Sequence, residues 1–181
     1  MSTDMSEHHK GIAKLRNHLE HDFSPESMED RLLLCSSILH AADLSSPSLE
    51  FKLAAQWEQK VTREFKKQTV LEGRMGIPVS AHMANTNSLS RASSQMGFIT
   101  QFAEPLWETM ALIFPELQPR YQQLLRNLDY YARTKKRLTA QLRAEAGTSA
   151  REQSSPPLHR TGSNGSSVSD LADLGNSSDS Q

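Results

Sequence analysis

The sequence has little of what several classes of protein require. It contains one cysteine, Cys35, so no disulfide can form within the chain, and a cytoplasmic location is expected. Its formal net charge of -1 lacks the basic excess of proteins that bind nucleic acid or anionic membranes. No apolar run approaches the roughly 20 residues of a membrane-spanning helix. With 181 residues, 36% of them hydrophobic, the composition predicts one ordinary soluble domain that binds neither nucleic acid nor membrane.

Aromatic residues, 6% of the chain, are missing altogether beyond Ala146. The segment 147–181 is instead rich in serine, glycine, asparagine and proline. Such a composition cannot bury enough apolar surface to offset the entropy lost on ordering. We therefore predict residues 1–146 as the domain and 147–181 as a disordered tail.

Within the domain, apolar residues recur at helical spacing, and no segment alternates with the two-residue period of a strand. The pattern predicts an all-α fold, a helical bundle. A helix over residues 31–44 carries its stripe at Leu32, Cys35, Ile38, Leu39 and Ala42. A second helix is expected to begin at Pro47 with Ser46 as its N-cap. Residues 90–114 and a segment after Pro119 predict two more.

The connection from Gly73 to Ser88 has no periodicity and contains Gly76 and Pro78. At about 16 residues it is longer than a usual structureless loop. Loops of this length are often functional, so a role in a binding site is expected for it.

Two polar residues interrupt the first apolar helix near its end. His40 and Asp43 lie three residues apart and therefore share one helix face. A carboxylate on the buried side of a helix costs free energy unless it is hydrogen-bonded or faces a cation. Asp43 either caps neighbouring backbone beside a core histidine or faces a metal ion, since carboxylate and imidazole are both common zinc ligands. The pattern leaves both interpretations open.

Gln95 presents a similar choice within the sequence SSQMGF. Its amide can donate and accept hydrogen bonds at once, which suits recognition of a purine edge. Phe98, about one helical turn later, could stack on the same ring. Alternatively, Gln95 bonds a backbone group beside a core phenylalanine, and the spacing alone does not decide between the two.

Five short motifs occur in one order at helix-length intervals: TDMSEHH, ILHAADLS, QW followed by REF, SQMGFI and PLWETM. In this combination the chain resembles the C-terminal half of the class I 3′,5′-cyclic nucleotide phosphodiesterase catalytic domain, over about residues 2–128. The resemblance implies hydrolysis of cyclic AMP or cyclic GMP to the 5′-monophosphate in signal transduction. It also implies two divalent metals, zinc and magnesium, that activate the attacking water.

The resemblance assigns roles to particular residues. Asp43 corresponds to the carboxylate that binds zinc and borders the nucleotide phosphate, and Thr3 and Asp4 lie where the family approaches water on the second metal. Gln95 corresponds to the glutamine that binds the purine edge, and Phe98 to the ring that clamps it. The family lines or backs its pocket at the positions of Met5, Trp57, Val61, Phe65 and Met83. The stripe formed by Trp57, Val61 and Phe65 fits a helical core equally well.

The sequence also departs from the family pattern. Ser46 stands where cyclic-AMP-selective members carry asparagine, which leaves the base preference open. The family's His-Asn-x-x-His segment and His-Asp pair, which supply the general acid and the remaining metal ligands, precede the Thr-Asp-Met-Ser motif. The dipeptide His21-Asp22 follows that motif in a charged stretch and does not replace them. We therefore expect the 181-residue chain alone to be inactive.

Two functions remain open on this basis. The chain is either part of a phosphodiesterase or a non-catalytic helical module that binds a nucleotide or another phosphodiesterase subunit. The presence of both Asp43 and Gln95 favours the first function, because packing alone does not require them. A cyclic nucleotide is the expected ligand, and a homodimer stays open.

Overall fold

The structure, a computed structural model, describes residues 5–21, 23–79, 81–84 and 87–153. Throughout these ranges the regular structure is helical, so the predicted all-α class is confirmed. The α-helices are, in chain order, α1 (His8–His21), α2 (Met28–Asp43), α3 (Phe51–Arg74), α4 (Ala81–Ala84), α5 (Ser88–Phe98), α6 (Glu104–Ile113) and α7 (Gln118–Gln153). Shorter turns join them: the 3-10 helices η1 (Met5–Glu7), η2 (Ser46–Ser48) and η4 (Pro115–Leu117), and the π-helix η3 (Ile99–Ala103).

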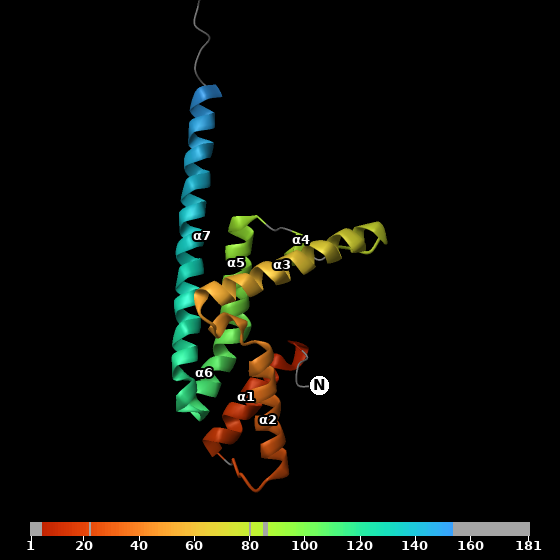
Figure 1. The fold of residues 1–181 in the computed structure, drawn as a ribbon, viewed down its shortest axis with the longest axis vertical. Helices are drawn as coiled ribbons and strands as arrows, with labels where there is room; N and C mark the ends of the chain where they lie inside the picture. The colour runs from red at the N-terminus through yellow and green to blue at the C-terminus, as the bar shows by residue number, and fades with distance from the viewer. Residues whose placement is uncertain (1–4, 22, 80, 85–86, 154–181) are drawn as a thin grey trace, which may run out of the picture.

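Helices α5, α6 and α7 form the packed layer of the molecule (Figure 1). The long helix α7 runs along the other two, and their contact buries Ala92, Ile99, Ala103, Trp107 and Leu124. The expected helix over residues 90–114 is divided by the π-helical turn η3, which directly precedes Pro105. Proline has no backbone N–H and cannot continue the regular hydrogen-bond ladder, which explains the irregular turn at this point.

Helices α1 and α2 form a hairpin that packs against α6 (Figure 1). Helix α2 begins at Met28 because the Ser27 hydroxyl accepts a hydrogen bond from the Asp30 N–H, at 3.3 Å. The end of α2 is fixed to the packed layer by Trp107, whose Nε1 donates to the carbonyl of Leu44 at 3.2 Å. The apolar residues buried in this second cluster are Ile12, Leu15, Ala41, Leu106 and Met110.

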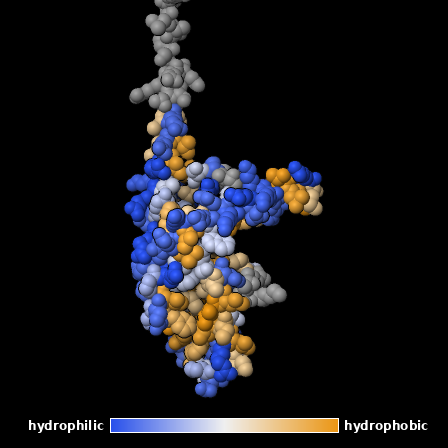
Figure 2. Space-filling view, in the orientation of Figure 1, coloured by the Kyte–Doolittle hydropathy of each residue, from blue (hydrophilic) through white to orange (hydrophobic). Residues whose placement is uncertain are grey.

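Helix α2 packs through the face opposite to its apolar stripe. Leu32 and Leu39 are 59% and 55% exposed, and the rest of the predicted stripe, Cys35, Ile38 and Ala42, is exposed too. The buried residues of α2 are mostly polar: Asp30, Ser37, His40 and Ala41. The apolar stripe is therefore not a packing face within the described part of the chain, because none of the described helices covers it. Figure 2 shows apolar surface where α2 lies and at the free end of α3.

Helix α3 is anchored at its N-terminal end and then extends away from the bundle (Figure 1). The Phe51 ring lies 3.9 Å from the Tyr130 ring of α7, measured between centroids. The expected start at Pro47, with Ser46 as N-cap, is wrong. Pro47 belongs to the separate turn η2, and α3 begins at Phe51. The proline cannot donate to a helix ladder, and its turn is closed instead by the N–H of Ser48.

The far end of α3 closes in a Schellman turn. Gly76 adopts a φ of 68°, and the N–H of Ile77 bonds the carbonyl of Glu72 at 2.9 Å. The predicted connection over residues 73–88 is therefore partly helical, since α3 continues to Arg74 and the short helix α4 follows.

Helix α7 extends further than the sequence indicated. It continues to Gln153, so residues 147–153, expected in the tail, are helical. The remainder of the predicted tail lies outside the described residues. Along the described ranges, every helix is too short or too polar to cross a membrane.

Candidate functional site

A cleft of about 1040 Å³ lies between α3 and α5, with η2 and the end of α2 completing its lining. It brings together the predicted site residues from five helical elements that are distant in sequence: Met5, Asp43, Val61, Phe65, Met83, Gln95 and Phe98. The other two predicted residues, Thr3 and Asp4, lie outside the described residues. The connection containing α4 contributes Met83 to this cleft, as the sequence led us to expect.

Asp43 is the last residue of α2, and its side chain is exposed to the cleft. The helix is closed without it: the N–H of Leu44 bonds His40 O at 3.1 Å, and the N–H of Ser45 bonds Ala42 O at 3.2 Å. Among the described residues, the Asp43 carboxylate has no hydrogen-bond donor. The capping interpretation is therefore wrong, and the carboxylate faces the cleft with its lone pairs available.

The two walls of the cleft differ in chemistry. The α3 wall is apolar: Trp57, Val61 and Phe65 line it, and Trp57 is 52% exposed because no described element covers this face. The stripe is thus a cleft wall and not a core. The α5 wall carries Gln95 and Phe98, both half-buried. Within the described part of the chain the Gln95 amide bonds no backbone group, so the alternative interpretation of Gln95 is not supported either.

A charged pair that the sequence analysis missed also lies in the cleft wall. Arg91 of α5 donates from Nε to Glu58 Oε1 of α3 at 2.8 Å and from Nη2 to Glu58 Oε2. Thr62 donates to the same Oε1 at 2.8 Å. Burial and the Glu58 charge raise the pKa of the neighbouring Tyr131 to about 12, so its hydroxyl is protonated at neutral pH. The sequence could have indicated the position of Arg91, because Arg91 lies four residues before Gln95 and therefore on the same helix face.

His40 is a buried histidine whose partner is another histidine. His8 Nδ1 and His40 Nε2 lie 2.7 Å apart, a distance at which the two rings share one proton. Burial, with the nearby His40, lowers the pKa of His8 to about 4, so its imidazole is neutral at physiological pH. The pair connects α1 to α2 and explains why α2 buries a polar face.

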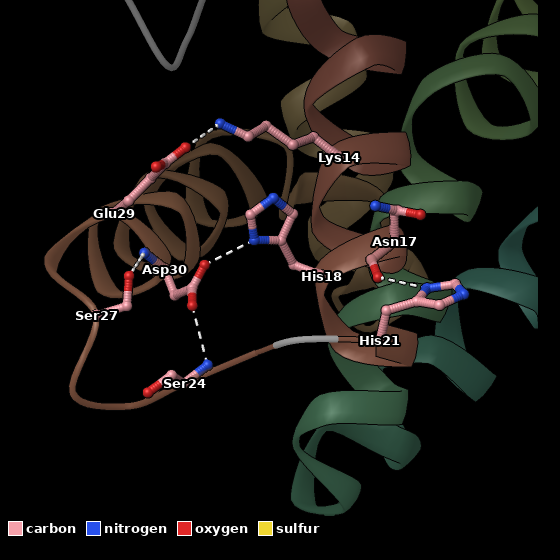
Figure 3. Close-up of polar contacts among 8 residues, drawn as sticks. All are labelled: Lys14, Asn17, His18, His21, Ser24, Ser27, Glu29 and Asp30. Carbon is pink, nitrogen blue, oxygen red and sulfur yellow. Dashed lines mark hydrogen bonds and ion pairs between the residues drawn. The ribbon is translucent and has the colours of Figure 1, made fainter.

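A second polar cluster lies at the other end of the α1–α2 hairpin (Figure 3). His18 Nδ1 lies 2.6 Å from Asp30 Oδ1, and the Ser24 N–H donates to Asp30 Oδ2 at 2.9 Å. These bonds lower the pKa of Asp30, with the Ser24 N–H as the largest cause. His21 points away and donates to the carbonyl of Asn17 at 3.0 Å. The cluster fixes the interhelical turn, and neither His18 nor His21 lines the cleft.

The family resemblance implies metal ions, which need several protein ligands close together in space. Zinc sites have three or four protein ligands. In the described ranges, no three histidine, cysteine, aspartate or glutamate side chains lie close enough to hold a metal. Asp43 supplies a single carboxylate, so the described residues do not form a metal centre by themselves. They therefore do not account for a metal-dependent reaction without further ligands.

Most of the chain matches a known protein family. Residues 1–124 match the family model of the 3′5′-cyclic nucleotide phosphodiesterases. The chain belongs to this family. The resemblance predicted from the five motifs is thereby confirmed.

Individual relatives agree with this assignment. The chain is 33% identical over 139 residues to 3′,5′-cyclic-AMP phosphodiesterase 4C of Mus musculus. The aligned segment covers 72% of this chain and 20% of that protein. It is 31% identical over 139 residues to the probable 3′,5′-cyclic-AMP phosphodiesterase pde-4 of Caenorhabditis elegans, again 20% of that protein. The chain therefore spans about a fifth of the length of these relatives.

The fold has solved counterparts as well. The phosphodiesterase domain of the Salpingoeca rosetta rhodopsin phosphodiesterase superposes with a TM-score of 0.73 at 25% sequence identity. The match covers 79% of this chain and 44% of that domain. The helices described here thus have the arrangement of part of a phosphodiesterase catalytic domain.

Proposed function

We propose that the chain forms the nucleotide-binding side of the catalytic cleft of a phosphodiesterase that hydrolyses cyclic AMP or cyclic GMP to the 5′-monophosphate. The observation that carries this proposal is the convergence of the predicted residues on one cleft from five helical elements. Packing does not account for this arrangement, because Asp43 is exposed, Gln95 is half-buried, and the apolar wall of α3 is left uncovered by the described helices. A concave apolar surface with a few polar groups that point into it is typical of a ligand site.

The chemistry of the lining suits a cyclic nucleotide. Gln95 can donate to and accept from the edge of a purine, and Phe98 offers its ring face for stacking. Val61 and Phe65 supply the opposite apolar wall, so that the flat base would lie between α3 and α5. Asp43, at the end of α2, lies on the cleft and would border the phosphate.

We propose zinc and magnesium as the metals of the complete site, with Asp43 as one oxygen ligand. The further ligands must come from polypeptide other than the described residues, because these bring no third ligand together. When bound, the metals supply a nucleophilic hydroxide at neutral pH. This chain contributes the binding and orientation of the nucleotide. A cytoplasmic location, expected from the single cysteine, stays a prediction.

A second function, a non-catalytic interaction module, is favoured by one observation. The exposed stripe of α2 presents Leu32, Ile38 and Leu39 to solvent, and large exposed apolar patches mark protein interaction sites. A homodimer or a complex with another phosphodiesterase subunit would cover this face. Both functions are compatible if the covering polypeptide also brings the missing metal ligands.

The proposed function can be tested by segment exchange. Residues 1–124 would replace the segment that they match in the mouse 4C enzyme, and hydrolysis of both cyclic nucleotides would be assayed with zinc and magnesium. We expect the chimera to be active, whereas the 181-residue chain alone should show no turnover. In the chimera, Gln95→Ala should raise KM about tenfold with little change in kcat, since it removes hydrogen bonds to the bound base.

The matched control is Gln122→Ala, because Gln122 is exposed on α7 away from the cleft lining. It should leave KM unchanged. An inactive but folded chimera, or a Gln95→Ala variant with normal KM for both nucleotides, would show that the cleft does not bind the base.

A further inference from the structure

The two members of the Glu58–Arg91 ion pair differ in exposure, and Arg91 is the more exposed of the two. The Glu58 side chain is 6% exposed, whereas the Arg91 side chain is 34% exposed. Both residues line the cleft, but the carboxylate is enclosed by donors from Arg91 and Thr62. The part of the pair that is open to solvent is therefore mostly the arginine side chain.

The guanidinium is held in a fixed orientation with part of its donor capacity unused. Its Nε and Nη2 are bonded to the two oxygens of Glu58, and the ion pair raises the pKa of Arg91, so the group stays charged. Among the described residues, Nη1 has no acceptor. Nη1 and the outer hydrogen of Nη2 form the second edge of the planar group, which can bind two acceptors side by side.

The position of Arg91 relative to Gln95 defines what this edge can contact. The two residues are four apart on α5 and so lie on one face, one helical turn from each other. Gln95 is the residue proposed to bind the purine edge. A base bonded to Gln95 would therefore present the neighbouring part of its edge to Arg91, since both residues line the cleft. Phe98 lies on the other side of Gln95 along α5.

The two purines differ in this part of the edge. Guanine presents two acceptors, O6 and N7, and a guanidinium binds them with two parallel hydrogen bonds. Adenine presents N7 as an acceptor beside a 6-amino donor. A group that has only donors meets the 6-amino group unfavourably, while the Gln95 amide can adapt to either base.

We propose that Arg91, oriented by Glu58 and Thr62, is a specificity-determining residue that selects a 6-oxopurine, the base of cyclic GMP, over a 6-aminopurine. The inference rests on the proposed function, because it requires the base to lie beside Gln95. It assigns to this chain a base preference that differs from the names of its cyclic-AMP phosphodiesterase relatives.

The test measures binding of cyclic GMP and cyclic AMP to the full 181-residue chain by saturation-transfer NMR titration up to millimolar concentrations. We expect cyclic GMP to bind about tenfold more tightly than cyclic AMP, the discrimination typical of one bidentate contact. The double variant Glu58→Gln/Arg91→Gln removes the guanidinium and leaves no unpaired buried charge. It should bring the two affinities to within about twofold of each other.

Two further variants keep the result interpretable. Arg91→Lys preserves the charge and the ion pair with Glu58 but lacks the planar second edge, so it should also lose the preference. Arg63→Gln alters an exposed arginine of α3 and should retain it. Circular dichroism would confirm that each variant folds.

The outcomes separate this inference from the proposed function. If both nucleotides bind and cyclic AMP binds as tightly as cyclic GMP, or if the double variant keeps the wild-type ratio, the inference is overturned and the proposed function stands. If the wild-type chain binds neither nucleotide, the inference is overturned, whereas the proposed function is decided separately by the activity of the chimera.

Discussion

Two regions of the molecule have the same kind of amphipathic sequence pattern but differ in burial. The apolar faces of α5, α6 and α7 are covered, whereas the apolar stripes of α2 and α3 are exposed. In the first region Leu124 is fully buried, and Leu106 and Met110 of α6 are each 1% exposed. In the second, Leu39 and Trp57 are more than half exposed. An apolar stripe shows that a helix can bury one face, whereas burial itself requires a partner surface.

The difference also separates structural from functional surfaces. The uncovered stripe of α3 is a wall of the cleft, next to Gln95 and Asp43. In the uncovered stripe of α2, by contrast, Leu32, Ile38 and Leu39 do not line the cleft. We therefore interpret the first stripe as a ligand surface and the second as a surface for polypeptide.

The strongest test of this comparison replaces one leucine in each region. Leu124→Ala creates a cavity in the packed layer and should reduce the free energy of unfolding by about 2–5 kcal/mol. Leu39→Ala should change it by less than about 0.5 kcal/mol, because the side chain is already in water. Urea unfolding followed by circular dichroism measures both. Equal effects would mean that the α2 stripe is covered in solution.

The link between the two regions can be broken at Asn127. This buried side chain of α7 donates at 2.8 Å to the carbonyls of Pro47 and Leu49, which fixes η2 ahead of α3. Asn127→Ala leaves these carbonyls without their donor and should cost about 1–3 kcal/mol in the same unfolding experiment. Gln122→Ala, on the exposed side of α7, is the control. A loss no greater than that of the control would show that η2 is held by other contacts.

The His8–His40 contact predicts a pH dependence of stability that belongs to the α1–α2 side. The pKa of His8 is about 4 in the folded chain and 6.5 in the reference state, so the unfolded chain binds more protons between these values. The contribution is fully present above about pH 6.5 and is lost as the pH falls towards 4. Thermal midpoints measured across this range should fall on acidification.

The variant His8→Gln isolates this contribution. It should flatten the dependence between pH 6.5 and 4. The lowered pKa of Asp30 acts in a separate window: its stabilisation is present above its reference value of 3.8 and is lost below it. A His8→Gln profile parallel to the wild type would contradict the lowered pKa of His8.

The smallest effect is expected from deleting residues 154–181. This segment contains no aromatic residue and is rich in serine, so we propose that it adds little buried apolar surface. Its removal should change the free energy of unfolding by less than about 0.5 kcal/mol. A lower thermal midpoint after truncation would show instead that the segment docks on the domain.

The sequence by itself determined the all-α class, the positions of most helices and the family. Helical periodicity is local, and the five motifs lie in short contiguous strings, so neither needs tertiary information. At Pro47 prediction failed because a proline fits either the first turn of a helix or a separate turn before it, and the structure has the second. The residues of the cleft were found from the resemblance, since Asp43 and Gln95 each allowed a capping or packing interpretation on spacing alone.

Only the tertiary structure decided which apolar faces are covered and which polar groups are paired. The polar face of α2 is buried because His8 and Ser24 supply partners for His40 and Asp30 from other elements. Glu58 of α3 and Arg91 of α5 form an ion pair although they are 33 residues apart in sequence. Such pairings depend on the distance between side chains in space, which sequence separation does not encode, and they determine whether a helix face becomes core, cleft or open surface.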